Sequence, residues 1–177
     1  MIKNIKTLRK IRVLIFLLIS LLFLNCKKNQ NKFYSYKIVN DQGNTIGYYE
    51  RKVYVDRENR VDSIFKLDKN RNTEKIHVET FLTYKDRLLK NDEIYLSIIK
   101  DSCWTYSDID YEVKRCFLGR ENLIIDGVEY KGLYKFKSNQ LEIDGLSTEE
   151  YYDEDLILLK KEVLKGAVYF KIIRLNK

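Results

Sequence analysis

Short hydrophobic runs separated by polar turns fill the chain from residue 33 to its end. Between Val128 and Lys137, apolar side chains alternate with charged ones, although Leu133 breaks the polar face. A period of two is typical of a half-buried strand. In residues 74–84 the alternation is weaker, because Phe81 stands on the face opposite Val78 and neither face is fully polar. A curved sheet whose strands are apolar on both faces can enclose a cavity.

The remaining runs have strand-like composition and recur about every ten residues, which predicts a mainly β protein. We expect an antiparallel meander of about nine to eleven strands with little helix, forming a strongly curved sheet or a barrel. Asp126-Gly127 between two apolar runs predicts a tight hairpin turn. Residues 147–152 fit a helical turn, through a capping box from Ser147 to Glu150, or a strand equally well. The other predicted strands span 33–40, 45–56, 61–67, 94–99, 156–163 and 167–175.

The start of the chain has a different pattern. Five basic residues precede an apolar run of 12 residues, from Val13 to Leu24. A membrane-spanning helix needs about 20 apolar residues, so this run is too short for a permanent span. A basic head followed by a short apolar run is typical of a secretory signal. The sequence therefore predicts that the chain is exported.

The segment Leu22-Phe23-Leu24-Asn25-Cys26 resembles the lipobox of bacterial lipoproteins. Asn25 stands where that family prefers a small residue, and Phe23 where it prefers a branched aliphatic one. An ordinary cleaved signal and an uncleaved signal anchor are the alternatives. The resemblance implies cleavage before Cys26 and a lipid on its sulfur, and several acyl chains together anchor a protein firmly.

The same resemblance implies a location in the bacterial cell envelope. Lys27 and Lys28 follow the cysteine, in place of the aspartate that retains some lipoproteins at the inner membrane. The outer membrane is therefore the expected destination. The predicted organisation is a cleaved signal peptide at 1–25, a lipidated tether at 26–32, and a single β-rich domain at 33–177.

Removal of the signal changes the charge. Residues 1–25 hold five basic residues and no acidic one, so the net charge falls from +7 for the whole chain to +2 for residues 26–177. Most of the positive net charge of the whole chain therefore comes from the signal. Together with export, this argues against nucleic acid as a partner.

Three cysteines are an odd number for an exported protein. Lipidation of Cys26 leaves Cys103 and Cys116, which we expect to form a structural disulfide outside the cytosol. Free thiols and a redox pair are the alternatives. If the two lie opposite each other in a hairpin, Trp104 faces Arg115 and Tyr106 faces Val113, with a loop at 108–111.

Residues that carry chemistry are few. His77 is the only histidine, and it lies within a predicted strand without a nucleophile motif. The stretch from Asp68 to Glu79 partly imitates a calcium loop, but Thr73 replaces the required glycine, so a polar turn is expected. No zinc site, other metal or cofactor is predicted. One acidic cluster is expected to be a solvated loop, and it comprises Glu149, Glu150, Asp153, Glu154 and Asp155.

The sequence thus predicts a non-enzymatic binding or interaction module on the membrane, of the immunity, inhibitor or envelope-binding type. Its partner would be an unidentified protein or envelope ligand. The 14 tyrosines support this hypothesis, because tyrosine is a low-entropy contact residue. The alternative is a carrier or chaperone for lipid or another apolar ligand, held in a cavity of the curved sheet. A hydrolase with two facing carboxylates is the third hypothesis.

Overall fold

The computed structural model describes residues 30–68, 70–100, 102–108, 111–141, 146–165 and 169–175. The predicted signal peptide, Cys26 and residues 26–29 of the predicted tether lie outside these ranges. All regular elements in the described ranges are strands, and no helix there is long and apolar enough to cross a membrane. The strands are β1 Gln30–Asn40, β2 Thr45–Asp56, β3 Asn59–Leu67, β4 Thr73–Thr83, β5 Arg87–Lys90, β6 Glu93–Ser97, β7 Cys103–Ser107, β8 Glu112–Ile125, β9 Val128–Gln140, β10 Ser147–Tyr152, β11 Leu158–Lys165 and β12 Phe170–Leu175.

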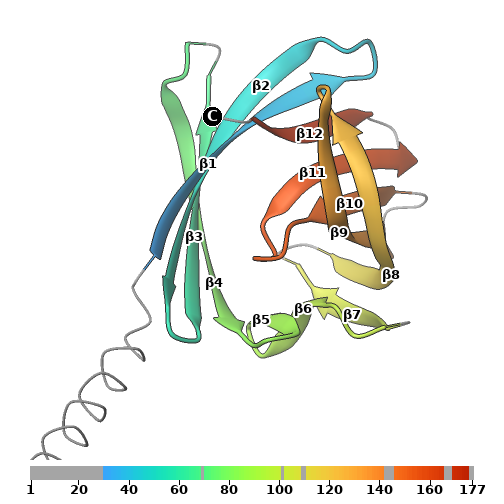
Figure 1. Ribbon diagram of the computed structural model, residues 1–177. Helices are drawn as coiled ribbons and strands as arrows, with labels where there is room; N and C mark the ends of the chain where they lie inside the picture. The colour runs from blue at the N-terminus through green and yellow to red at the C-terminus, as the bar shows by residue number, and fades with distance from the viewer. Residues whose placement is uncertain are drawn as a thin grey trace, which may run out of the picture.

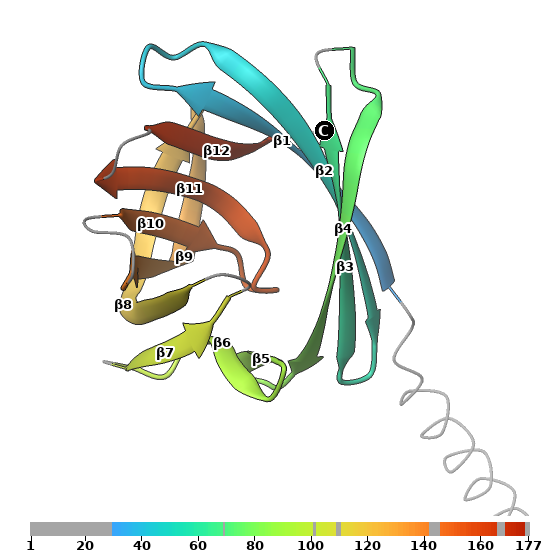
Figure 2. The ribbon, with the colours of Figure 1, turned by 180° about the vertical axis from the view of Figure 1, so that it is seen from behind.

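The 12 strands form one antiparallel sheet in the order β6-β5-β4-β3-β2-β1-β12-β11-β10-β9-β8-β7. The sheet curves round until its two edges face each other, as a nearly closed barrel-like sheet (Figure 1, Figure 2). The predicted antiparallel, strongly curved sheet is confirmed. The strand count exceeds the predicted nine to eleven, and β5 is a strand that the pattern did not indicate. Its Leu88 and Leu89 are too short an apolar run to stand out.

The first and last strands pair at the middle of the sheet. Ser35 lies opposite Leu175, and Asn40 lies opposite Phe170. β1 begins at Gln30, so the last three residues of the predicted tether belong to a strand instead. The edges of the sheet are β6 and β7, which are neighbours in the chain. A meander therefore closes on itself with its termini paired and its midpoint at the seam.

Side chains bridge the seam between β6 and β7. The backbone N–H of Ser107 donates to Glu93 Oε2 at 2.7 Å, and Arg115 Nη1 donates to the carbonyl oxygen of Tyr95 at 2.8 Å. Lys90 Nζ on β5 lies 3.6 Å from the carboxylate of Asp108, beyond β7. These contacts cover edge groups that would otherwise be open to pairing with another chain.

The interior holds the main core. Five of its apolar side chains are at most 1% exposed, namely Tyr36, Phe81, Leu88, Leu96 and Phe136. Phe136 is its aromatic centre, because its ring meets Tyr152 at 5.3 Å and Trp104 at 6.2 Å, both edge-on. Edge-to-face pairs at such distances add to the free energy gained from burial.

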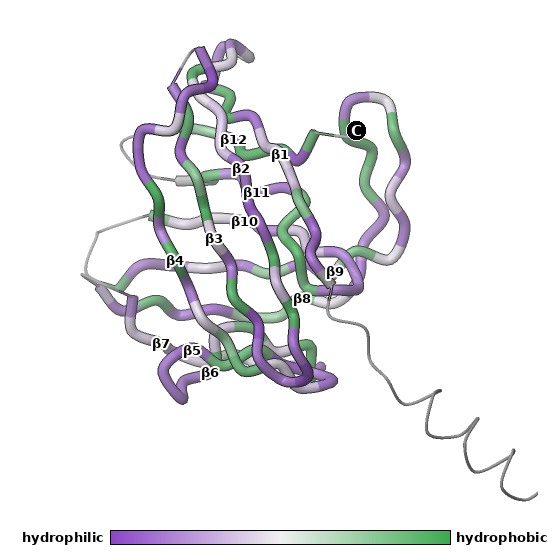
Figure 3. The backbone as a smooth tube through the Cα atoms, turned by 90° about the vertical axis from the view of Figure 1, so that its left-hand side faces the viewer, coloured by the Kyte–Doolittle hydropathy of each residue, from purple (hydrophilic) through white to green (hydrophobic). Residues whose placement is uncertain are grey.

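A second, smaller core lies on the other face of the sheet. The far half of the β8–β9 hairpin packs there through Ile125 and Leu133 against Tyr151 of β10 and Leu159 of β11. Hydrophobic and hydrophilic segments accordingly follow one another along the strands (Figure 3). At the hairpin tip, Asp126 and Gly127 have φ values of 48° and 80°. This confirms the predicted tight turn, which needs positive φ at both positions.

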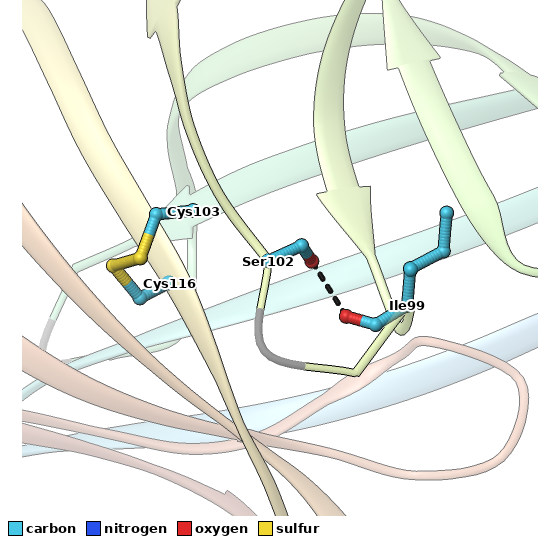
Figure 4. The surroundings of a disulfide bond; sticks show 4 residues. All are labelled: Ile99, Ser102, Cys103 and Cys116. Atoms are coloured by element: carbon cyan, nitrogen blue, oxygen red, sulfur yellow. Dashed lines mark hydrogen bonds between the residues drawn. A yellow bond between two sulfur atoms is a disulfide. The ribbon is translucent and has the colours of Figure 1, made fainter.

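A disulfide joins Cys103 of β7 to Cys116 of β8 (Figure 4). The predicted register is confirmed, since Trp104 lies opposite Arg115 and Tyr106 opposite Val113. Because β7 is an edge strand, the disulfide fixes that edge to the rest of the sheet.

Residues 147–152 form β10 and not a helical turn. Thr148 faces Ser138 of β9, and Glu149 faces Glu162 of β11, so the segment is paired on both sides. Tertiary pairing here outweighs the local capping pattern, as is common for short segments.

Candidate ligand-binding site

Two clusters of buried charge organise the interior. The first is on β2 and β3, where the carboxylate of Asp62 is shared by two arginines. Arg51 Nε donates to Asp62 Oδ2 at 2.8 Å, and its Nη2 contacts the same oxygen. Arg60 donates from Nε to Oδ1 and from Nη2 to Oδ2, both at 2.8 Å. Asp62 is 0% exposed, so one buried carboxylate balances two guanidinium groups and one positive charge remains.

Burial alone would lower the pKa of Arg51, but the charge of Asp62 and those of nearby tyrosines together raise that pKa above its ordinary value. Arg60 has a further partner, because its guanidinium lies 5.7 Å from the centre of the Phe81 ring. A desolvated cation over an aromatic face is stabilised by the ring quadrupole. The cluster is therefore a fixed, positively charged unit inside the sheet.

The second cluster joins β8, β10 and β11. Glu150 accepts from Arg115 Nη2 at 3.0 Å and from the hydroxyl of Tyr152 at 2.7 Å, and its Oε1 lies 3.0 Å from Lys161 Nζ. Burial would raise the pKa of Glu150, but Arg115 and Lys161 lower it to about 2. Here too a single carboxylate balances two cations.

Arg115 is held on all sides. Its Nε donates to Ser138 Oγ at 2.8 Å. The guanidinium carbon lies 4.7 Å from the ring centre of Tyr95 and 4.9 Å from that of Tyr106. This one side chain thus links β6, β7, β9 and β10, and it belongs to both the second cluster and the seam.

The acidic cluster predicted as a solvated loop is corrected by these contacts. Glu150 is 1% exposed, because alternation along β10 turns it inward while Glu149 turns outward. Glu149 lies 3.3 Å from Lys135 Nζ, and Asp153 accepts from Arg174 at 2.6 Å. The acids therefore belong to separate ion pairs instead of one site. Within the described part of the chain, only the exposed Glu154 of this group makes no ion pair.

The other predicted candidates are local features. His77 lies in β4, 3.6 Å from Glu79, as expected of a strand histidine. Asp68 accepts from the backbone N–H of Asn72 at 2.7 Å, which makes the supposed calcium loop a polar turn. No group of three or more potential metal ligands occurs among the described residues.

A cavity of about 400 Å³ opens at the end of the sheet where β1 begins. We call it the β1-end cavity. The cavity lies near the start of β1, because Gln30 pairs with Val55, and Val55 lines the cavity. Its apolar lining is Val53, Val55, Leu156 and Ile157.

The wall of this cavity on the β10–β11 side is held by hydrogen bonds. Arg60 Nη1 donates to the carbonyl oxygens of Asp155 at 3.3 Å and Leu156 at 3.1 Å. Lys32 Nζ donates to Asp155 at 2.5 Å, and Ile157 N–H donates to Asp153 Oδ1 at 3.0 Å. The first charge cluster thus reaches the cavity through Arg60, and hydrogen bonds within the protein hold this wall in place.

The opposite wall carries polar groups without partners. Thr83 lines the cavity, and its Oγ1 atom is buried with no hydrogen-bond partner among the described residues. Arg57 and Lys85 line the same cavity, are exposed, and make no ion pair in the part of the chain described. A buried polar atom without a partner is uncommon in native proteins and calls for an explanation.

A smaller cavity of about 170 Å³ is lined by Arg115, Lys161 and Gln140. The core residues Tyr36, Phe81 and Phe136 line neither cavity and are almost fully buried. The interior is therefore filled at its centre by aromatic side chains, with space left near the ends.

Sequence reasoning missed both charge clusters. Arg60-Val61-Asp62 alternates as a strand does, and the alternation places Val61 on the opposite face from the two charged residues. This alternation was not used, because the predicted strand begins only at Val61 and leaves Arg60 outside it, whereas β3 begins at Asn59. Charged residues are seldom buried unless they are paired, and pairing partners on other strands are not visible in one sequence.

Comparison with protein-family models, with curated proteins and with solved structures found no match.

Proposed function

We propose that this protein is a lipid-anchored binding module of the bacterial cell envelope, exported by residues 1–25 and held at Cys26. Its ligand occupies the β1-end cavity. The observation that carries the proposal is this cavity of about 400 Å³, one wall of which is held by hydrogen bonds from Arg60 and Lys32. Ligand sites in proteins are largely preformed, concave and about 300–1,000 Å³ in volume.

The lining suits a ligand. Val53, Val55, Leu156 and Ile157 supply apolar contact, and Thr83 supplies a buried hydroxyl that has no hydrogen-bond partner among the residues the structure describes. Sites that combine an apolar lining with a few placed polar groups are typical of small-molecule recognition.

The position of the cavity fits an anchored protein. Cys26 precedes Gln30 by four residues, which reach at most about 14 Å. Val55 lies opposite Gln30 in the β1–β2 ladder, so the cavity and the proposed anchor are near each other. A ligand presented at the membrane surface would meet this end of the sheet first.

The second candidate function is a carrier for lipid or another apolar ligand, favoured by the same apolar lining. Tyr36 and Phe136 are 0% exposed and fill the centre of the interior. The space therefore suits a headgroup or a short chain better than a whole diacyl lipid. The hydrolase hypothesis gains no support, because Asp62 and Glu150 lie in separate clusters and each is balanced by two cations.

Native mass spectrometry of the protein extracted from its membranes tests the ligand. We expect a bound mass that is lost in Val55→Phe, which fills the cavity, and kept in Thr80→Phe, which adds the same ring at an exposed position. Absence of any bound species, together with no thermal shift from envelope extracts, would contradict the binding module. Labelling with a palmitate analogue tests the anchor, and it should mark the wild type and not Cys26→Ser.

A further inference from the structure

The charges around the β1-end cavity point to the kind of ligand it holds. We infer that the cavity takes an anionic ligand whose phosphate or carboxylate group lies at Arg57, Lys85 and the hydroxyl of Thr83. The inference rests on the proposed function, since it requires that the cavity is a ligand site.

The first argument is the charge balance of the lining. Lys32 and Asp155 neutralise each other at 2.5 Å. Arg57 and Lys85 are left without ion pairs in the described ranges, against one unpaired acid, Glu154. Behind the wall, Arg51 and Arg60 share the single carboxylate of Asp62. Both the mouth and the wall therefore carry an excess of positive charge, which attracts anions.

The second argument is the backbone at Arg57. Asp56 pairs with Asn59, so Arg57 and Glu58 form a two-residue hairpin turn. Arg57 has φ of 55°, in the left-handed region that favours glycine, asparagine or aspartate. An arginine at such a position is strained, and strained residues concentrate at functional sites. The turn holds a long cationic side chain at the cavity where a smaller residue would suit the backbone better.

The third argument is the convergence of donors on one side of the mouth. The N–H of Thr83 donates to the carbonyl oxygen of Glu58 at 2.6 Å. This hydrogen bond joins the β2–β3 turn to the end of β4, so that Arg57 and the pair Thr83 and Lys85 lie on neighbouring segments. Two cations and the Thr83 hydroxyl, which has no partner within the described ranges, then line the same space, and charge-assisted hydrogen bonds to oxyanions are the strong kind.

Glu154 sets the orientation of the ligand. It lies on the β10–β11 side of the cavity, between Asp153 and the ion-paired Asp155. Its carboxylate repels an anion there. The anionic group is therefore directed to the β2–β3 and β4–β5 side, and the apolar part of a ligand faces Val53 and Leu156.

The test is titration of the detergent-extracted protein with three probes, namely short-chain phosphatidylglycerol, short-chain phosphatidylcholine and glycerol phosphate. We expect the phosphatidylglycerol to bind at least tenfold more tightly than the phosphatidylcholine. The double variant Arg57→Gln with Lys85→Gln should lose at least tenfold in affinity, and raised salt should weaken binding to the wild type. Thr83→Val should lose a smaller factor.

The control variant is Lys114→Gln with Lys137→Gln, which removes the same charge from exposed positions outside the cavity. It should bind as the wild type does. Binding of glycerol phosphate equal to that of the lipid would assign a free phosphate compound as the source of the anion, and preference for the lipid would assign a headgroup.

The outcomes separate the two proposals. If Val55→Phe abolishes binding while the charge variant binds normally, or if both lipids bind equally, the cavity is a ligand site but the anion inference is wrong. If no probe binds, and Val55→Phe also leaves the species bound in native mass spectrometry unchanged, the proposed function fails as well.

Discussion

Arg115 and Glu150 lie 3.0 Å apart inside the sheet, although 35 residues separate them in the chain. Their side chains are 3% and 1% exposed. They meet because Arg115 of β8 faces Ser138 of β9, which in turn faces Thr148 of β10, two residues before Glu150. Three strands thus have to be in register before these two charges meet, and the stability of the interior depends on that register.

Removal of the Glu150 charge should therefore be severe. Glu150→Gln leaves Arg115 and Lys161 without their counter-ion, and breaking a buried ion pair costs about 3–5 kcal/mol. Urea unfolding followed by tryptophan fluorescence measures the loss. Glu154→Gln, at an exposed acid in the same segment, should change stability by less than about 0.5 kcal/mol. Equal effects of the two substitutions would show that the cluster does not support the fold.

In the first cluster, loss of the Asp62 charge should destabilise the protein more than loss of an arginine. Asp62→Asn leaves two guanidinium groups facing each other, whereas Arg51→Met leaves the pair of Arg60 and Asp62 intact. We expect Asp62→Asn to cost about 3–5 kcal/mol and Arg51→Met clearly less. Chemical denaturation of both variants gives the order. A larger loss for Arg51→Met would contradict an excess of positive charge.

Glu150 should also make the folding stability of the protein fall at acid pH. Its pKa is about 2 in the folded protein and 4.5 as the ordinary value. The folded state therefore binds this proton less readily than the unfolded chain. The stabilisation, on the order of 3 kcal/mol, is complete above about pH 4.5 and is lost as the pH falls towards 2.

Thermal unfolding across this pH range checks the prediction in the wild type and in Tyr152→Phe. The tyrosine hydroxyl donates to Glu150 at 2.7 Å, so its removal should raise the pKa and move the acid transition to higher pH. An unchanged transition would show that another carboxylate controls it.

The disulfide should add measurable stability at the seam. The two cysteines are 13 residues apart in sequence, and closing a loop of that length is worth about 3 kcal/mol in the chain-entropy model. Reduction, or Cys103→Ser with Cys116→Ser, should lower the unfolding free energy by about that amount. A thiol count on the oxidised, unfolded protein checks the bond directly, and two reactive thiols from this pair would contradict it.

Local features of the fold were predictable because a few neighbouring residues determine them. Asp126-Gly127 indicates a turn by its residue types alone, and the spacing of Cys103 and Cys116 is enough to indicate the register of their hairpin. β5 was not predicted, because Leu88 and Leu89 alone do not indicate a strand. β10 was ambiguous because its capping residues compete with pairing on both sides.

The candidate site was not predictable in the same way. Arg57 and Lys85 line one cavity only because the β2–β3 turn is hydrogen-bonded to Thr83. Glu150 appeared to belong to an acidic loop, since its cationic partners Arg115 and Lys161 come from other strands. Burial of charge depends on contacts between distant segments, and one sequence does not show them.

The pairing of β1 with β12 also determines when the sheet can be completed. As the chain emerges and folds, β1 can pair with β2 at once, but its other edge stays open until β12, Phe170–Leu175, is available. Contacts between distant segments form slowly, and open edges pair readily with other chains. The protein is therefore most exposed to misassociation along β1, directly after the proposed anchor, until β12 pairs with it.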